Sequence, residues 1–279
     1  MSRKPIAPLR RWGFILLVCA IVGWSLFPFA WQVVTSFEPD RNLAEFTPHW
    51  LPISDGTLQH YRNVFGTKRF TQYMRNSLIV AACATAVALV FATAAAYVVT
   101  QRRRSGRGAI VAGVLCVSVF PQVAIVTPIY QALLRLQLLN SYAGLAAVYA
   151  GLSLPLIFVV VANHFRTIPH EIYDAARLDG AGPIRTLWSI TVPLAAPGIV
   201  PAALLGFIAS WNEFLLALSL VSSPTRQTAP VGIANFTGMY SIPWGDIAAA
   251  AVTTTTPLVI LVLVCQRRIV AGLTAAATG

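Results

Sequence analysis

Charged residues are scarce in this chain of 279 residues: Lys, Arg, Asp and Glu together make up only 10% of it, whereas hydrophobic residues make up 57%. Ordinary soluble proteins are roughly 25% charged. A soluble domain could not hide so much apolar surface, so the composition predicts an all-α membrane protein with several spanning helices.

Paired cysteines and clustered metal ligands are also missing. The four cysteines lie far apart within apolar runs, at Cys19, Cys83, Cys116 and Cys265. Because no C-x-x-C spacing exists, neither a disulfide framework nor a metal site is predicted, and we expect inert packing residues. His60 and His164 have no second ligand at a suitable spacing, so we expect both to be surface residues.

The sequence has no G-x-x-x-x-G-K-[ST] phosphate loop, so this chain is not expected to bind ATP in the P-loop manner. No Ser/His/Asp arrangement suggests catalysis, and the predicted protein is not an enzyme. The formal net charge of +11 is spread over short caps between apolar runs, which argues against a nucleic-acid partner. Energy for any transport must come from another chain or from an ion gradient.

Six apolar stretches are long enough, at about 20 residues each, to cross a bilayer. They are 12–36, 77–100, 108–128, 141–163, 197–221 and 247–266. The chain then divides into a tail (1–11), a first helix with an external segment (12–76), a five-helix core (77–266) and a second tail (267–279). Most basic residues, including Arg102–Arg104 and Arg267–Arg268, fall on the cytoplasmic side if both termini face the cytoplasm.

Two spans and the external segment have distinctive compositions. The second span is rich in alanine, which favours a buried bundle helix. Pro121 and Pro128 interrupt the third span and predict a kink. In the external segment we expect short helices near 58–65 and 70–74.

The only long segment between two apolar runs that is both charged and helical in pattern is 170–193, and its pattern predicts two helices. Pro169 and Glu171 favour a helix start, and Gly180 favours its end. Gly182-Pro183 predicts a second short helix that ends before Pro193. One face of the first helix is small and nearly smooth, and we expect it to lie closely against another surface. It comprises Ile172, Ala175, Ala176 and Asp179.

The spacing in this segment resembles the EAA loop of ABC importer permeases. The family pattern is E-A-A, three residues, G, nine residues, I, one residue and L-P. The matching residues are Asp174, Ala175, Ala176, Gly180, Ile190, Val192 and Pro193, with conservative departures at Asp174 and Val192. In that family the loop forms a coupling helix, which sits in a cleft of the cytoplasmic ATPase. The resemblance implies that loop 164–196 couples to an ATPase, with further contacts from Glu171, Arg177, Leu178 and Asp179.

The fifth span contains Trp211, Asn212 and Glu213, and Glu213 is the sole acid well inside a predicted span. An ionised carboxylate near the bilayer centre costs roughly 2.5–3.5 kcal/mol, so it should face protein or water. Trp211 and Asn212 would give a sugar stacking and hydrogen-bonding groups in a translocation pathway. A structural hydrogen bond from Glu213 to a neighbouring helix is the alternative, and the sequence leaves both open.

Further positions resemble the carbohydrate-uptake members of the same family. Their T-x-x-x-Y pattern and N-S pair are matched by Thr57, Tyr61, Asn76 and Ser77. The W-N-[ED] triplet at 211–213 is typical of these members, as is the segment after it that contains Asn235 and Phe236. We assign Asn235 and Phe236 to the pathway with the triplet.

The chain is similar to the smaller permease of maltose-type importers. The resemblance implies a type I permease fold of six spans in the cell membrane, surrounded by lipid. It also implies a second related permease, two cytoplasmic ATPase subunits that bind ATP and Mg, and an external solute-binding protein. The chain itself would bind no cofactor. The implied function is import of a sugar, a di- or oligosaccharide, by alternating access.

Other functions remain open at this point. An ion-coupled secondary transporter would normally place several ionisable residues inside its bundle, whereas only Glu213, with Asp246 at a span edge, is available. A membrane scaffold would move no solute. An ABC permease for a glycerol phosphodiester or an amino sugar would have the same coupling loop.

Overall fold

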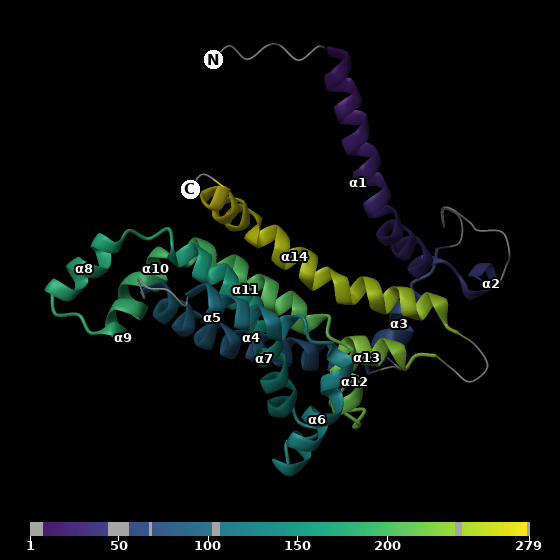
Figure 1. The fold of residues 1–279 in the computed structure, drawn as a ribbon. Coiled ribbons are helices and arrows are strands. Elements are labelled where there is room, and N and C mark those ends of the chain that lie inside the picture. The colour runs from purple at the N-terminus through teal and green to yellow at the C-terminus, as the bar shows by residue number, and fades with distance from the viewer. Residues whose placement is uncertain (1–7, 44–55, 67–68, 102–106, 238–241, 278–279) are drawn as a thin grey trace. The chain divides into compact units, whose positions relative to one another are not determined.

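The computed structural model describes residues 8–43, 56–66, 69–101, 107–237 and 242–277 (Figure 1). Within these residues the chain is entirely helical, as the composition predicts. The predicted basic cluster Arg102–Arg104 lies outside them. The helices, one of them the π-helical stretch η1, are α1 (Pro8–Phe37), α2 (Asp40–Leu43), α3 (Gln59–Gly66), α4 (Phe70–Gln101), α5 (Arg107–Ser118), α6 (Gln122–Arg135), α7 (Tyr142–Phe165), α8 (His170–Leu178), α9 (Pro183–Arg185), η1 (Thr186–Thr191), α10 (Val192–Leu194), α11 (Ala196–Trp211), α12 (Leu215–Leu220), α13 (Ala229–Ala234) and α14 (Trp244–Ala277).

The chain forms two compact units. The first comprises Met1–Phe70 and Asn235–Thr255, and so contains α1, α2, α3 and the beginning of α14. The second comprises Thr71–Ala234 and Thr256–Gly279, and so contains nearly all of α4, the helices from α5 to α13 and the rest of α14.

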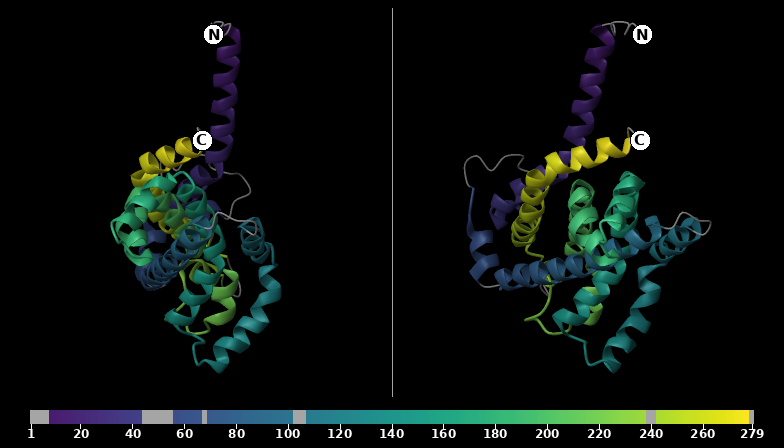
Figure 2. Two further views of the ribbon diagram at one scale, coloured as in Figure 1. Left: turned by 60° about the vertical axis from the view of Figure 1, so that its left-hand side comes forward. Right: turned by 90° about the vertical axis from the view of Figure 1, so that its left-hand side faces the viewer.

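The centre of the second unit is a close pair of helices, α7 and α11, which lie side by side (Figures 1 and 2). On one face of α11 every fourth residue is small and buried: Gly198, Ala202, Gly206 and Ser210. Small residues allow membrane helices to approach closely. We call this contact the α7–α11 seam.

The residues of α7 that face this stripe occur in reverse order, so the two helices are antiparallel. A Cβ atom at position 198 would overlap His164, and one at position 206 would overlap Ile157. Further along, the Oγ atoms of Ser153 and Ser210 lie 3.2 Å apart. His164 is therefore half-buried in the seam rather than at the surface as predicted.

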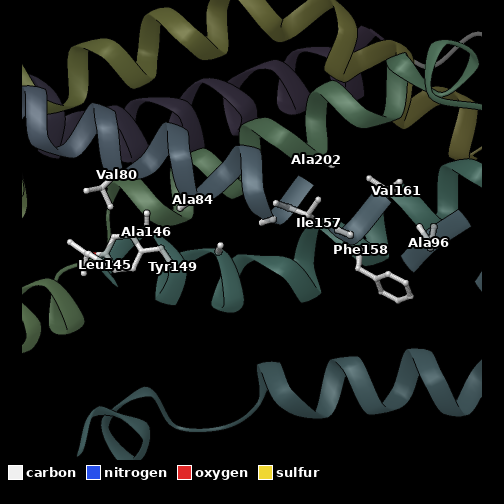
Figure 3. Packing of buried hydrophobic residues seen from close by; sticks show 14 of the residues in the cluster. Val80, Ala84, Ala96, Leu145, Ala146, Tyr149, Ile157, Phe158, Val161 and Ala202 are labelled. Carbon is white, nitrogen blue, oxygen red and sulfur yellow. The ribbon is translucent and has the colours of Figure 1, made fainter. Parts of the chain in front are cut away.

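A stripe of alanines on α4 joins the same buried core, at Ala84, Ala88, Ala92 and Ala96. Their spacing of four residues places them on one face of the helix. In Figure 3, Val80 and Ala84 of α4 lie near Leu145 and Tyr149 of α7. The alanine-rich second span is therefore a helix with one face in the bundle core, as predicted.

Four described helices are long and apolar enough to cross a membrane: Trp12–Phe37, Phe70–Gln101, Tyr142–Phe165 and Trp244–Gln266. They match the first, second, fourth and sixth predicted spans. A fifth span results if Pro183–Leu194 and Ala196–Trp211, which meet at an 86° bend, are counted together.

The other predicted spans are discontinuous in the structure. The predicted span 108–128 is divided into α5 and α6 at residues 119–121, where Pro121 cannot donate a backbone hydrogen bond. The predicted span 197–221 is divided into α11 and α12 at residues 212–214. In the external segment, α3 confirms the helix expected near 58–65, whereas 70–74 is the first turn of α4.

The first unit is built around a buried histidine. His60 on α3 is only 1% exposed, so its predicted surface position is wrong. His60 Nδ1 lies 2.9 Å from Asp246 Oδ1 at the start of α14, and Nε2 lies 2.8 Å from the carbonyl oxygen of Glu38. Buried polar groups require such partners, and these two tie the end of α1 to the start of α14. Sequence spacing could not predict the pair because Asp246 is distant in the chain.

Because the α7–α11 seam is closely packed, we expect a single methyl group added there to destabilise the protein. We expect Gly198→Ala to lower the free energy of unfolding by about 1–3 kcal/mol, because the new Cβ overlaps the His164 ring in a packed core. Thermal unfolding in detergent measures the change. Gly151→Ala is the matched control on α7, because that position has open space around it. Equal stability of the two variants would contradict the close packing.

His60→Leu is expected to destabilise the first unit by about 1–3 kcal/mol, because it leaves the Asp246 carboxylate and the Glu38 carbonyl without their ring partner. Limited proteolysis and thermal unfolding check this loss. Gln59→Leu, at the exposed neighbouring position, is the control and should stay close to the parent chain. An unchanged His60→Leu protein would show that the pair contributes nothing.

Candidate functional site

The predicted coupling segment begins with α8 (His170–Leu178), which starts directly after Pro169 and ends as predicted at Gly180. Gly180 has φ of +73°, a left-handed conformation that favours glycine. Backbone hydrogen bonds from Gly180 to Arg177 O and from Ala181 to Ala176 O close the helix end. This glycine therefore sets where the chain leaves α8.

One side of α8 packs on the chain itself. Tyr173 and Ala176 are buried, and the Tyr173 ring lies against Tyr97 near the end of α4. Burial raises the pKa of the Tyr173 phenol, so the group remains neutral. Ala176 was predicted to share a docking face with Ala175, and this is wrong: Ala176 points inward and Ala175 is exposed.

The other side of α8 is exposed and mixes acids with one large apolar residue. It carries Glu171, Asp174, Ala175 and Leu178, and Leu178 is 90% exposed. Arg177 Nη1 lies 3.5 Å from Asp174 Oδ1, so these two charges face each other along the helix. Asp179 is also exposed. This side of α8 thus presents one apolar side chain among charged ones at the surface of the second unit.

The second helix of the segment runs further than predicted. Residues 183–194 are continuously helical through α9, η1 and α10, so Pro193 lies within the helix rather than after it. Pro193 is the second residue of α10 and follows η1, where the backbone pattern changes from π-helical to α-helical. Ile190 is half-buried in η1, whereas Ile184 and Trp188 are exposed. The 86° bend after Leu194 then leads directly into α11.

Glu213 occupies the break between α11 and α12, and its carboxylate bonds to the backbone. Its Oε1 accepts a hydrogen bond from the Leu216 N–H at 2.9 Å, and its Oε2 accepts one from the Ala217 N–H at 3.1 Å. These N–H groups have no partner within the first turn of α12. Glu213 therefore has a structural role: its carboxylate caps the start of α12 in its own chain, rather than bonding to a neighbouring helix.

A cavity of about 90 Å³ lies beside Glu213 in the second unit. Its polar lining comes from α6, α7 and α11 together with the break, at Gln122, Tyr149, Ser153, Ser210 and Glu213. Leu152 and Ala209 complete the wall. The sequence predicted only Glu213 in this group, and Tyr149 and Ser153 could have been noticed as polar side chains within an apolar span.

The other predicted pathway residues do not line this cavity. Trp211 is 2% exposed and stacks on Phe207 with ring centroids 5.5 Å apart. Asn212 is exposed, but its amide donates to Ile208 O of its own helix. Phe236 belongs to the first unit, where it packs edge-on against Phe70. Asn235, in the same unit, is exposed.

Asn76 and Ser77 organise the end of the second unit that lies opposite α8. Asn76 Nδ2 donates to Thr225 O and Gln227 O, and its Oδ1 accepts from the Tyr142 hydroxyl at 2.8 Å. Ser77 Oγ accepts from the Ala229 N–H. These bonds hold the loop between α12 and α13 against the starts of α4 and α7. The N-S pair thus has a physical reason that its spacing alone did not show.

Among the described residues there is no group of three or more His, Cys, Asp or Glu side chains that could hold a metal ion. Nor do the described residues bring a nucleophile and a base together or form a cofactor site. What they offer is a rigid helix pair, an exposed helix at one end and a small polar cavity along its length. This is the architecture of a multi-pass membrane protein.

Comparison with known proteins identifies the family to which this chain belongs. The chain belongs to the family of binding-protein-dependent transport system inner membrane components, whose model matches residues 6–274. It is therefore a multi-pass inner membrane component of a transport system. Its exposed α8 lies in the position of the EAA-like pattern found in the sequence.

Two characterised relatives align over almost their full lengths. The sulfoquinovosyl glycerol transport system permease protein SmoH of Agrobacterium fabrum is 36% identical over 96% of this chain and 92% of its own. The trehalose transport system permease protein SugB of Mycobacterium tuberculosis is 38% identical over 92% of this chain and 93% of its own.

A solved structure has the same fold. It is a bacterial ABC transporter involved in the import of the acidic polysaccharide alginate, matched with a TM-score of 0.81 at 20% identity. The match covers 96% of this chain and 100% of that one. The fold is therefore that of an ABC importer permease.

Removal of the Glu213 cap has a predictable cost. Glu213→Ala leaves the Leu216 and Ala217 N–H groups unpaired, and we expect a loss of about 0.5–2 kcal/mol in stability. Thermal unfolding and proteolysis near residues 212–216 measure it. Asn212→Ala, at the exposed preceding position, is the control. If Glu213→Ala were no less stable than that control, the carboxylate would not be a structural cap.

Proposed function

We propose that this chain is one of two permease subunits of an ATP-driven importer of a sugar. Its partners are a second related permease, two cytoplasmic ATPase subunits that hold ATP and Mg, and an external solute-binding protein. Six spans place both termini and the segment 164–196 in the cytoplasm. The observation that carries the proposal is the exposed face of α8, which ends in the left-handed Gly180 at the EAA-like spacing.

The geometry of α8 supports a coupling role because the helix has two different sides. Its inner side, with Tyr173 and Ala176, is fixed to the rest of the second unit. Its outer side offers Leu178 and the charges of Glu171, Asp174 and Asp179 to an ATPase. A load on the outer side is transmitted inward through the packed side chains, since close-packed interiors resist deformation.

A sugar as the solute is supported by the relatives. SmoH and SugB are permease proteins of transport systems for sulfoquinovosyl glycerol and for trehalose, which are both glycosides. Alternating access then moves the solute between the binding protein and the cytoplasm while the ATPases close and open.

The proposal is tested by gentle detergent isolation of the tagged chain from its native membrane, with partners identified by mass. We expect a P-loop ATPase and a second permease to be recovered. Recovery of the chain alone, under conditions that keep a known ABC importer intact, would favour an ion-coupled secondary transporter. Uptake of labelled trehalose and maltose by the reconstituted complex then tests the sugar assignment.

The coupling role predicts the behaviour of Gly180→Trp. The position is exposed and an added Cβ would meet no atom within 4 Å, so the tryptophan side chain would project into the surface that an ATPase would occupy. We expect normal membrane insertion, with ATP hydrolysis uncoupled from solute uptake in proteoliposomes. Normal uptake would refute the coupling role.

Gly180→Ala separates bulk from backbone strain. It carries the same left-handed strain, of about 1–2 kcal/mol, without the indole. We expect it to retain most of the coupled uptake. If the alanine variant were as uncoupled as the tryptophan variant, the conformation of the turn rather than its outer surface would be what matters.

A further inference from the structure

The cavity beside Glu213 lies at the middle of α7 and at the C-terminal end of α11. Ser153, on its wall, is at the centre of α7 (Tyr142–Phe165), and α7 is one of the four helices long enough to span a membrane. The cavity therefore lies at the level of the centre of a helix that is long enough to span a membrane. Elsewhere in the α7–α11 seam Gly198 and Gly206 allow close contact, whereas Ser210 lies on the wall of the cavity.

A polar cavity at this depth is not compatible with lipid. Gln122 on its rim is exposed, and Glu213 is partly exposed. In hydrocarbon, polar side chains without partners cost several kcal/mol, so such groups face protein or a water-filled pathway. The open side of the cavity must then face water, a solute or the second permease.

The cavity wall also has more hydrogen-bonding capacity than the chain uses. Ser153 and Ser210 share one hydrogen bond between their hydroxyls, which leaves a donor and further acceptor sites. Each carboxylate oxygen of Glu213 accepts one backbone N–H and can accept another hydrogen bond. Tyr149 adds a phenol whose bond to Glu213 O is long, at 3.5 Å.

From this geometry we infer that the cavity is a solute-contacting site in the translocation pathway of this subunit, with Tyr149, Ser153 and Ser210 as its binding residues. Sugar hydroxyls both donate and accept hydrogen bonds, which matches the unused capacity of the two serines and the phenol. The inference rests on the proposed function, because it assumes that the chain lines the route of a sugar.

The first experiment tests whether a water-soluble reagent reaches the cavity. In a complex whose permease chain lacks its native cysteines, Ser210→Cys is treated with a membrane-impermeant cationic methanethiosulfonate. The reaction is followed without nucleotide and in the vanadate-trapped state. Leu156→Cys, on the exposed apolar side of α7, is the matched control. We expect Ser210→Cys to react much faster than the control in at least one state, and trehalose or maltose with the binding protein to slow the reaction.

The labelling results distinguish a sugar-contacting pathway from a dry contact with the second permease. No reaction of Ser210→Cys in either state would overturn the inference and assign the cavity to a dry contact with the second permease. Reaction without protection by a sugar that the parent complex transports would also overturn it. If the parent complex transports neither sugar with ATP but Ser210→Cys still reacts, the sugar assignment fails while the cavity stays on an aqueous path.

A second measurement uses the hydroxyls directly. Ser210→Ala and Tyr149→Phe are each expected to lower the number of sugar molecules moved per ATP by about three- to tenfold, the size of one lost hydrogen bond. Ser219→Ala is the control, because its hydroxyl bonds to Leu215 O of its own helix and lies outside the cavity. Unchanged ratios in both variants would contradict solute contact at this site.

Discussion

The close approach of α7 and α11 is the constraint on which the second unit depends. Membrane helices gain little from apolar burial alone, because lipid tails are as apolar as leucine. Their association relies on contact at short range, which Gly198, Ala202 and Gly206 permit. The core residues of α4 and α7 then form one buried cluster around this pair. A side chain larger than these glycines would separate the helices along the whole line.

The same pair connects the two functional features of the unit. α11 begins at the bend that follows the coupling segment and ends at the break beside the cavity. α11 packs closely against α7 at Gly198, Gly206 and Ser210, along most of its length. Under the proposed function, a force on α8 would therefore move the pair as one body and change the cavity at its far end.

Much of the fold and of the candidate site could be predicted from the sequence, because these features depend on residues close together in the chain. Apolar length predicted four of the spans, and the proline, acid and glycine around 169–180 predicted the limits of α8. What failed depends on contacts between distant residues. Nothing near Ala176 indicates that it packs inward, and nothing near His60 indicates Asp246 as its partner. Pro121 indicated the interruption at 119–121, whereas the break at 212–214 was hidden because a hydropathy window averages over two short helices.

The break at Glu213 shows how one residue can serve two requirements that the sequence presented as alternatives. A helix interrupted inside the membrane exposes backbone N–H groups, and the Glu213 carboxylate satisfies two of them within its own chain. The interruption also ends the small-residue stripe, so the helices no longer close the space beside Ser210. A carboxylate placed there stabilises the discontinuity and leaves lone pairs facing the cavity. A structural cap and a polar wall are thus consequences of the same break, and neither excludes the other.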